Sequence, residues 1–181
     1  MKKEIIEWIK SIGLAIVIAF VITSFLTSIE VYSVSMNPTL VEGDRLILLN
    51  SKNVEYKDIV VVNSQIELSK GELKKLSFME KLKGQTTKKL IKRVIAREGD
   101  KLVIKDGEVY VNDLKLDEGY IKENGTWPEI NIDSIPENKI FVMGDNRNNS
   151  MDSRQLGLID KDEIVGKTLI RIYPFSKFGT I

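Results

Sequence analysis

The feature that most constrains this chain is a run of uncharged residues near its start. After Lys10 no charged residue occurs until Glu30, and the stretch from Ile12 to Ile29 is almost entirely apolar. As a helix, these 18 residues would span about 27 Å, close to the roughly 30 Å hydrocarbon core of a bilayer. The run therefore predicts a single transmembrane helix, so that residues 1–30 form a short tip and a membrane anchor.

Two other interpretations of this run are open. A cleavable signal peptide usually has a shorter apolar stretch and small residues at its exit, and a buried core helix is rarely apolar on every face. Lys2, Lys3 and Lys10 precede the run, and positive charge tends to stay on the cytoplasmic side. We therefore expect a single-pass anchor in the cell membrane, with the N-terminus in the cytoplasm and the rest of the chain outside.

Beyond Glu30 the chain changes to short runs rich in β-branched residues. In the stretch 101–112, Asp106-Gly107 lies between two such runs, and Asp-Gly suits a two-residue hairpin turn. Further candidate strands are 44–50, 58–63, 89–96 and 139–145. The lysine-rich stretch 66–90 has weak helical periodicity and predicts a solvated loop or short helix between strands. Residues 31–181 are therefore expected to form a mainly β, antiparallel domain.

The residues that are missing restrict the chemistry. The chain has no cysteine and no histidine, which excludes disulfides, thiol nucleophiles, Cys/His zinc sites and Ser-His-Asp triads. A hydrolase of this composition needs Lys, Asp, Glu or a metal-bound water as its base. The net charge is only +1, which argues against a dedicated nucleic-acid binder.

A lysine can act as a base only when its amine is neutral. An ordinary lysine is only about 0.04% neutral at pH 7, and burial among apolar groups lowers its pKa. Lys92 interrupts the apolar run 89–96, where strand alternation places it on one face with Val94 and places Ile91 on the other. It is therefore the candidate base, the alternative being a lysine that snorkels at a strand edge.

Candidate nucleophiles lie just after the apolar run. Ser33 and Ser35 occur in the stretch VYSVSMNPTL, and the following Asn37-Pro38 predicts a turn. A serine at the end of a strand can be presented to a nearby base. The alternative is that both are hydrogen-bonded linker serines.

A second unusual stretch, residues 144–157, is dense in Asp, Asn, Arg and Ser. It is open to interpretation as a polar surface loop or as a calcium-type loop, but the spacing does not fit an EF-hand. Its alternating charges predict an ion-pair network that holds the loop in place. The residues of this network are Asp145, Arg147, Asp152 and Arg154.

Taken in order, these segments resemble a bacterial type I signal peptidase, the membrane-bound Ser–Lys protease of the leader peptidase family. The resemblance covers most of the chain and implies an antiparallel β-sheet catalytic domain that needs no metal and no cofactor. It rests on the anchor and on SMNPTL at 35–40, EGDRLIL at 42–48, KRVIAREGD at 92–100, GDNRNNSMDSRQLG at 144–157 and YPFSKFG at 173–179.

The resemblance implies a role for each matched residue. Ser35 matches the nucleophile and Lys92 the general base. Ser33 matches the hydroxyl that joins the Ser35 N–H in the oxyanion hole, and Ser150 matches the hydroxyl that orients the lysine amine. The supporting ion pairs of the family match Arg93, Asp145, Asp152 and Arg154.

The implied activity is removal of N-terminal signal peptides from exported preproteins, with small residues at substrate positions −1 and −3. Val31 and Ile91 match strand positions beside the groove in which the family binds its substrate as an added β-strand. Expected partners are signal peptides, the phospholipid bilayer and the secretion translocon, and no nucleic acid is expected. The chain departs from the family at Ala96 and Glu98, where Gly and Pro are usual, so the turn there is expected to differ.

Two other functional classes are compatible with parts of this pattern. A self-cleaving repressor shares the Ser–Lys chemistry, but it would carry a DNA-binding helix-turn-helix in place of the apolar run. A catalytically inactive, membrane-anchored β module that binds export substrates is the better alternative.

Overall fold

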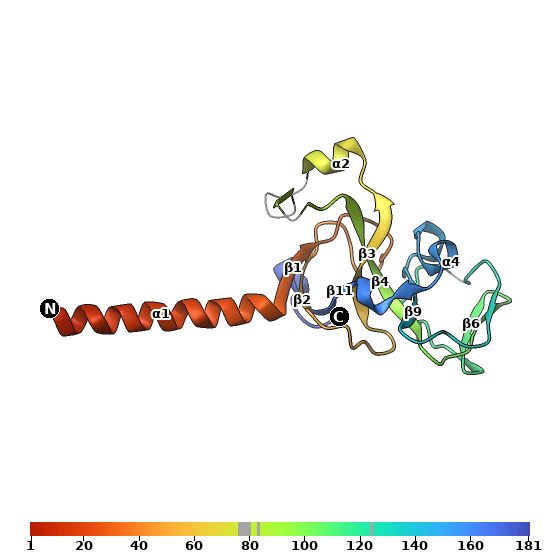
Figure 1. Cartoon of the computed structure of the whole chain (residues 1–181). Helices are drawn as coiled ribbons and strands as arrows, with labels where there is room; N and C mark the ends of the chain where they lie inside the picture. Colours follow the sequence, from red (N-terminus) through yellow and green to blue (C-terminus); the bar gives the residue numbers. More distant parts are fainter. Residues whose placement is uncertain (76–80, 83, 124) are drawn as a thin grey trace.

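A computed structural model describes residues 1–75, 81–82, 84–123 and 125–181. One long helix, α1 (Lys2–Phe25), projects from a body built mainly of antiparallel strands (Figure 1). The strands are β1 (Leu26–Glu30), β2 (Arg45–Leu49), β3 (Ile59–Glu67), β4 (Thr87–Arg97), β5 (Leu102–Lys105), β6 (Glu108–Val111), β7 (Leu114–Lys115), β8 (Ile130–Ile132), β9 (Lys139–Met143), β10 (Ile159–Asp160) and β11 (Ile164–Tyr173). The short helices are α2 (Lys70–Lys75), η1 (Arg147–Asn149), α4 (Ser153–Leu156), η2 (Lys161–Glu163) and η3 (Phe175–Lys177).

The strands form two antiparallel sheets. The larger has seven strands in the order β1-β2-β11-β3-β4-β9-β10, and the smaller has four in the order β7-β6-β5-β8. The predicted hairpin joins β5 to β6, with Lys105 opposite Glu108 and positive φ at Asp106 and Gly107. The predicted runs 44–50, 58–63, 89–96 and 139–145 correspond to β2, β3, β4 and β9. The mainly β, antiparallel architecture is therefore confirmed.

Strand β4 lies inside the larger sheet and contributes to three separate core clusters. Ile91 packs with residues of the segment after β1, Val94 packs with β3 and β9, and Ile95 packs with the smaller sheet. Ile91 and Val94 belong to different clusters, as the predicted alternation requires. A strand held on both faces is a rigid support for the side chains it carries.

The N-terminal helix ends earlier than the apolar run suggested. The prediction extended the helical segment to Ile29, whereas α1 ends at Phe25 and the next five residues form β1. Strand β1 pairs with β2 from Leu26 opposite Leu49 to Glu30 opposite Arg45. The backbone N–H and C=O groups of these residues thus pair with the free edge of β2. The pattern of apolar residues within one segment could not reveal this partner.

In the described part of the chain, no helix combines the length and the apolarity that a membrane crossing requires. The expected single-pass anchor therefore stays a prediction.

The lysine-rich stretch 66–90 contains the end of β3, the short helix α2 and the start of β4. The predicted short helix between strands is present as α2. The rest of that prediction, at residues 76–80 and 83, lies outside the described residues. The helix stands away from the sheet in Figure 1.

Candidate active site

The structure brings Ser35 and Lys92 together, although 57 residues separate them in the sequence. The amine Nζ of Lys92 lies 2.8 Å from Ser35 Oγ and donates a second hydrogen bond to the Ile91 carbonyl at 3.0 Å. Lys92 comes from the centre of β4, and Ser35 from the segment after β1. Only 2% of Lys92 and 6% of Ser35 is exposed. The pair is therefore placed for direct proton transfer in a site that largely excludes water.

Burial changes the acidity of the Lys92 amine. Loss of hydration lowers its pKa from 10.5 to about 8, because the charged form loses more solvation than the neutral one. The carboxylates of Asp152 and Asp145 act in the opposite direction, and the Arg154 guanidinium lowers the pKa further. Desolvation has the largest effect, so Lys92 is far more readily neutral than a surface lysine.

The hydroxyl of Ser33 joins the same group. Its Oγ lies 3.1 Å from Ser35 Oγ, and either hydroxyl can donate. Ser33 is exposed while Ser35 is buried, so Ser33 lies at the entrance to the site. A hydroxyl at that place can donate to an oxygen of a molecule that approaches Ser35.

Asn146 holds the segment that carries Ser35, and sequence reasoning missed it. Its amide Nδ2 donates to the Val34 carbonyl at 3.0 Å, and its backbone N–H donates to the Ser35 carbonyl at 3.0 Å. Asn146 is buried, and its Oδ1 accepts no hydrogen bond from the described residues. The density of polar residues in 144–157 was the available signal, but these contacts are tertiary.

Gly144 marks a close approach at the same place. A Cβ at this position would lie 2.5 Å from the Ser35 carbonyl oxygen and 2.3 Å from Ser150 Oγ. Ser150 therefore lies next to the Ser35 backbone. The expected hydrogen bond from Ser150 to Lys92 is absent, however, since the buried Ser150 Oγ has no partner among the described residues. The Ser150 side chain thus lies beside the Ser35 segment without a hydrogen bond to the amine.

One predicted ion pair holds β4 against the segment that follows β9. Arg93 Nε donates to Asp145 Oδ1 at 2.8 Å, and Arg93 Nη2 donates to Oδ2 at 2.7 Å. The Thr39 hydroxyl also donates to Oδ2, and the ring of Tyr120 lies 4.1 Å from the Arg93 guanidinium carbon. Both charged groups are buried. This bidentate pair fixes the residue beside Lys92.

The second predicted ion pair joins Asp152 and Arg154 through two hydrogen bonds of 2.8 and 2.9 Å. Asp152 also caps α4 and accepts a hydrogen bond from the Gly144 backbone. Burial alone would raise the pKa of this carboxyl, but the hydrogen bond and charge of Arg154 hold it below its ordinary value. Arg147, expected in the same network, instead pairs with Glu118 at 2.6 Å. Glu118 belongs to a distant segment, so sequence reasoning missed it.

Val31 and Ile91, the strand positions expected beside the substrate groove, have buried side chains. Both side chains pack in one core cluster, and only 1% of Val31 is exposed. The Val31 backbone N–H donates to the Asp44 carbonyl, and its own carbonyl accepts from Gly43. The place of Val31 and Ile91 beside a substrate groove stays a prediction. The exposed side chains before Ser35 belong to the segment 32–34.

The departure at Ala96 and Glu98 lies in the turn after β4. Ala96 is fully buried in the cluster that joins the two sheets. The Glu98 carboxylate accepts from the Asn138 backbone at 2.9 Å and pairs with Lys161 at 2.8 Å. Glu98 thus connects this turn to Asn138, just before β9, and to Lys161, just after β10. It has no hydrogen bond to Ser35 or Lys92.

Among the residues that the structure describes, no three or more carboxylates form a group that could hold a metal ion. The arrangement at Ser35 is instead that of an activated nucleophile: a hydroxyl, a buried amine of lowered pKa and a second hydroxyl at the entrance.

Comparison with known proteins agrees with this chemistry. Residues 5–173 match the family described as signal peptidase, peptidase S26. Signal peptidase IB of Staphylococcus aureus (strain COL) is 39% identical over 198 residues, which cover 98% of this chain and 94% of that protein. Signal peptidase I of Bacillus licheniformis is 36% identical over 193 residues, which cover 97% and 92%.

A crystal structure of a signal peptidase I from Enterococcus faecalis V583 is 23% identical in sequence, with a TM-score of 0.48. The structural match covers 64% of this chain and 96% of the E. faecalis chain. The family match spans most of the sequence, and the relatives from S. aureus and B. licheniformis align over nearly its whole length. The chain therefore belongs to the signal peptidases of peptidase family S26, and it is a serine endopeptidase of that family.

Proposed function

We propose that this protein removes N-terminal signal peptides from exported preproteins by acyl transfer through a Ser35–Lys92 dyad. The observation that carries the proposal is the 2.8 Å contact between Lys92 Nζ and Ser35 Oγ, with both groups buried. With a pKa of about 8, roughly one Lys92 in ten is neutral at pH 7, about 300 times more than for an unperturbed lysine. That neutral fraction is large enough for a general base.

The reaction proceeds in two stages. Neutral Lys92 takes the proton of Ser35 while Oγ attacks the scissile carbonyl carbon, and the Ser35 N–H and Ser33 hydroxyl donate to the resulting oxyanion. The protonated Lys92 then gives its proton to the leaving amine as the peptide bond breaks. Neutral Lys92 next takes a proton from water, which attacks the ester, and Ser35 leaves with its proton restored.

The substrate is proposed to be an extended segment with small residues at positions −1 and −3. The exposed stretch from Tyr32 to Val34 directly precedes the nucleophile, so a substrate backbone aligned there would present its carbonyl to Ser35. The names of the relatives support signal peptides as the substrate class.

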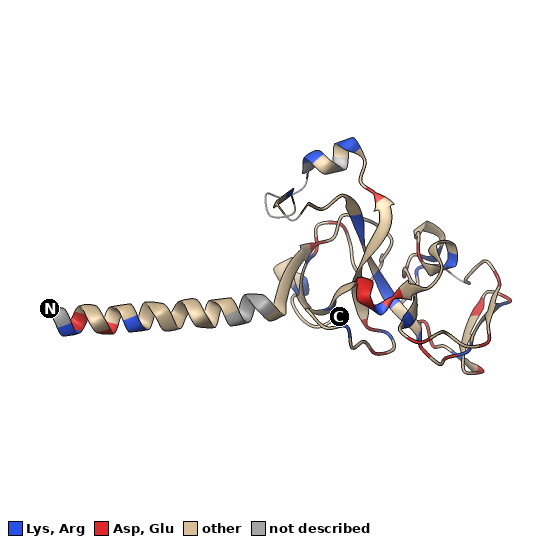
Figure 2. Cartoon of the chain, in the orientation of Figure 1, with Lys and Arg blue, Asp and Glu red and all other residues tan. Residues whose placement is uncertain are grey.

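We also propose that α1 anchors the enzyme in the cell membrane, with its N-terminus in the cytoplasm and its catalytic domain outside. In the membrane the enzyme would receive its substrates from the secretion translocon. The helix has 24 residues and extends freely from the body (Figure 1). Apolar side chains on all its faces, including Trp8, Leu14 and Phe20, are more than half exposed in the isolated chain. Lipid would cover them, and Lys10 can snorkel to the inner interface. Figure 2 shows the charges of α1 confined to its N-terminal part.

The test is cleavage of a purified preprotein that carries an Ala-x-Ala site, with the full chain in detergent. We compare wild type with Lys92→Met, which keeps the length of the side chain but removes the amine, and with Ser35→Ala. Both variants should lose at least about 10³-fold in kcat/KM. Lys105→Met removes an exposed lysine from the smaller sheet and should cleave at the wild-type rate.

The dyad is supported if wild type and Lys105→Met cleave after the second alanine and the two dyad variants do not. Retained turnover in Lys92→Met would remove Lys92 from the role of base. No turnover by any folded sample would favour the inactive β module that binds export substrates.

A further inference from the structure

The positive charge of this protein is concentrated in one segment. Residues 67–89 contain seven lysines and three glutamates, a net charge of +4, while the whole chain carries +1. The rest of the chain is therefore net negative. We refer to the described residues of this segment, 67–75, 81–82 and 84–89, as the lysine arm. Its described lysines are Lys70, Lys74, Lys81, Lys88 and Lys89.

The lysine arm begins at the last residue of β3 and ends in the first residues of β4, and the part between them stands away from the sheets. Helix α2 lies beyond the ends of β3 and β4 (Figure 1), it carries lysines (Figure 2), and Lys70 and Lys74 are exposed. None of the core clusters includes a residue of the arm. Of the residues that the structure describes, none places a carboxylate within ion-pair distance of Lys70 or Lys74. Within the described residues, the ammonium groups of Lys70 and Lys74 thus make no ion pair with the body of the protein.

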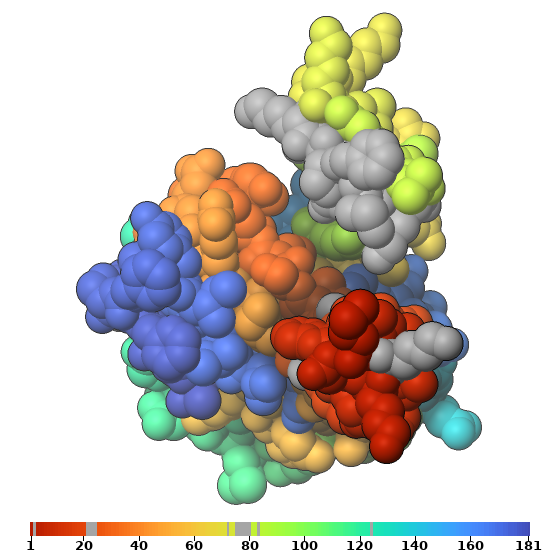
Figure 3. Space-filling model, turned by 90° about the vertical axis from the view of Figure 1, so that its left-hand side faces the viewer, coloured from red at the N-terminus to blue at the C-terminus, as the bar shows by residue number. Residues whose placement is uncertain are grey.

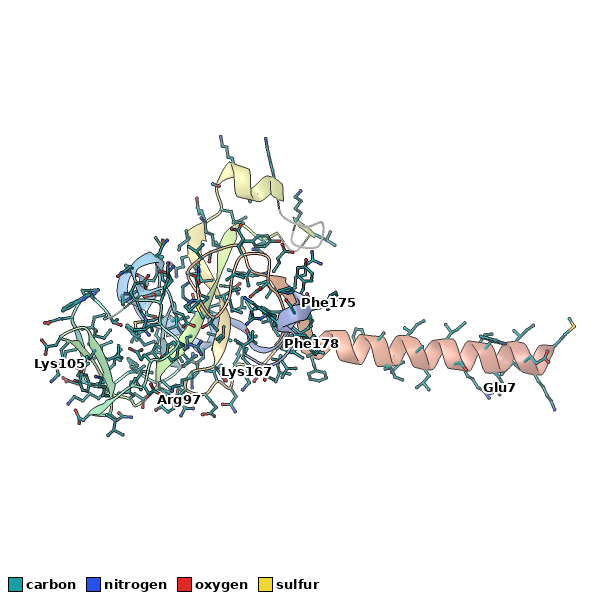
Figure 4. All side chains as sticks on the ribbon, turned by 180° about the vertical axis from the view of Figure 1, so that it is seen from behind. Glu7, Arg97, Lys105, Lys167, Phe175 and Phe178 are labelled. Atoms are coloured by element: carbon teal, nitrogen blue, oxygen red, sulfur yellow. The ribbon has the colours of Figure 1, made fainter. Side chains whose placement is uncertain are left out.

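The arm lies on the face from which α1 leaves the body. Figure 3 looks along α1 and shows the arm on this face, above the helix, with the C-terminal segment on the other side. Figure 4 places Phe175 and Phe178 beside the end of α1, and 82% and 61% of these residues is exposed. Tyr173, which stacks edge-on with Phe175, is also exposed. Exposed aromatic residues next to a membrane helix are typical of the lipid interface.

We propose that the lysine arm binds the anionic headgroups of the bilayer that α1 enters. This inference rests on the membrane placement of α1 proposed above. The ammonium groups of the arm would donate to lipid phosphates, and Phe175 and Phe178 mark the level of the interface at another place around the helix. Basic segments next to a membrane helix are attracted to anionic lipid in this way, within about a Debye length. Contacts on both sides of α1 would fix the tilt of the catalytic body over the membrane.

The absence of cysteine allows a clean test with single labels on the full-length chain. Lys74→Cys carries a fluorophore on the arm, and Lys105→Cys, a matched exposed lysine at the end of the body far from α1 (Figure 4), is the control. Ile16→Cys reports on α1 itself. Each protein is placed in nanodiscs of phosphatidylcholine, with or without phosphatidylglycerol, that contain a lipid with a quencher in its headgroup or, for Ile16→Cys, in its acyl chain.

We expect the Lys74 label to be quenched at least about twofold more in anionic discs than in neutral ones, and about 0.5 M salt should abolish the difference. The Lys105 label should be unaffected. Adding Lys70→Glu and Lys81→Glu should remove the extra quenching of the Lys74 label.

Three outcomes would overturn the proposal while Ile16 stays quenched by lipid: no quenching at Lys74, equal quenching in neutral and anionic discs, or extra quenching that survives the glutamate substitutions. The first of these would direct attention to an acidic protein as the partner of the arm. An unquenched Ile16 label would instead contradict the membrane placement of α1, and with it both proposals. Peptidase activity in detergent tests the dyad separately from either.

Discussion

Burial of Lys92 predicts that the proposed catalytic base lowers the stability of the folded enzyme at neutral pH. The amine has a pKa of about 8 in the folded state against 10.5 when unperturbed. Between these values the unfolded chain binds more protons than the folded one, so the free energy of unfolding rises with pH through this window. Below pH 8 the folded state carries the full cost of the buried amine.

The size of this effect follows from the two pKa values. A difference of 2.5 between 10.5 and about 8 corresponds to about 3 kcal/mol at pH 7 and falls to about 1 kcal/mol at pH 10. Lys92→Met removes this cost but also removes the amine as a donor to the Ile91 carbonyl and to Ser35 Oγ. The combined loss is about 1 kcal/mol at any pH, because Ser35 Oγ keeps the Ser33 hydroxyl as a partner. The variant should therefore be about 2 kcal/mol more stable than wild type at pH 7 and equally stable near pH 10.

Urea unfolding of both proteins in the same detergent at pH 7 and pH 10 measures this difference, with Lys105→Met as the control. The pH dependence of kcat/KM for wild type gives a second measure of the same pKa. Activity should rise about tenfold per pH unit below 8 and level off above it, because only the neutral amine is the base. A Lys92→Met variant that is less stable than wild type at pH 7, or an activity profile flat from pH 6 to 9, would refute the reasoning.

Three further predictions concern the surroundings of the dyad. Ser33→Ala should lower kcat by roughly 10²–10³-fold, the usual effect of losing one oxyanion donor; an unchanged kcat would remove Ser33 from that role. Gly144→Ala should cost about 1–3 kcal/mol in unfolding free energy and most of the activity, because its Cβ would lie 2.5 Å from the Ser35 carbonyl oxygen. Wild-type activity in this variant would show that the contact relaxes freely. Asp145→Asn should lower unfolding free energy by about 3–5 kcal/mol, since it leaves the Arg93 charge buried without a partner, and a thermal melt that matches wild type would contradict this.

Local patterns in the sequence were enough to predict several elements. The Asp106-Gly107 turn, the strands and the antiparallel class depend on alternation and turn chemistry, which act over a few residues. The place of Lys92 in an apolar run also predicted its burial, because a strand inside a sheet buries both of its faces. These features appear in the structure as expected.

The end of α1 could not be predicted in this way. Residues 26–29 carry no charge and continue the uncharged run of the helix before them, and only the free edge of β2, contributed by residues 45–49, makes them a strand. Likewise, the burial of Val31 depends on the backbone partners Gly43 and Asp44. Backbone groups of an edge strand take their partners from elsewhere in the chain, so local pattern does not decide between helix and strand there.

By itself, the sequence determined which chemistry was available: with no histidine and no cysteine, the base of a hydrolase is left to Lys, Asp, Glu or a metal-bound water, and Lys92 was the lysine in an apolar strand. Only the tertiary structure decided how Ser35 meets it. The hydrogen bonds from Asn146 and the close approach at Gly144 bring the Ser35 segment to β4, while Ser150 makes no hydrogen bond to the amine. Contacts at 2.8–3.0 Å depend on how the sheet packs, and residue spacing along a chain carries no information about that packing.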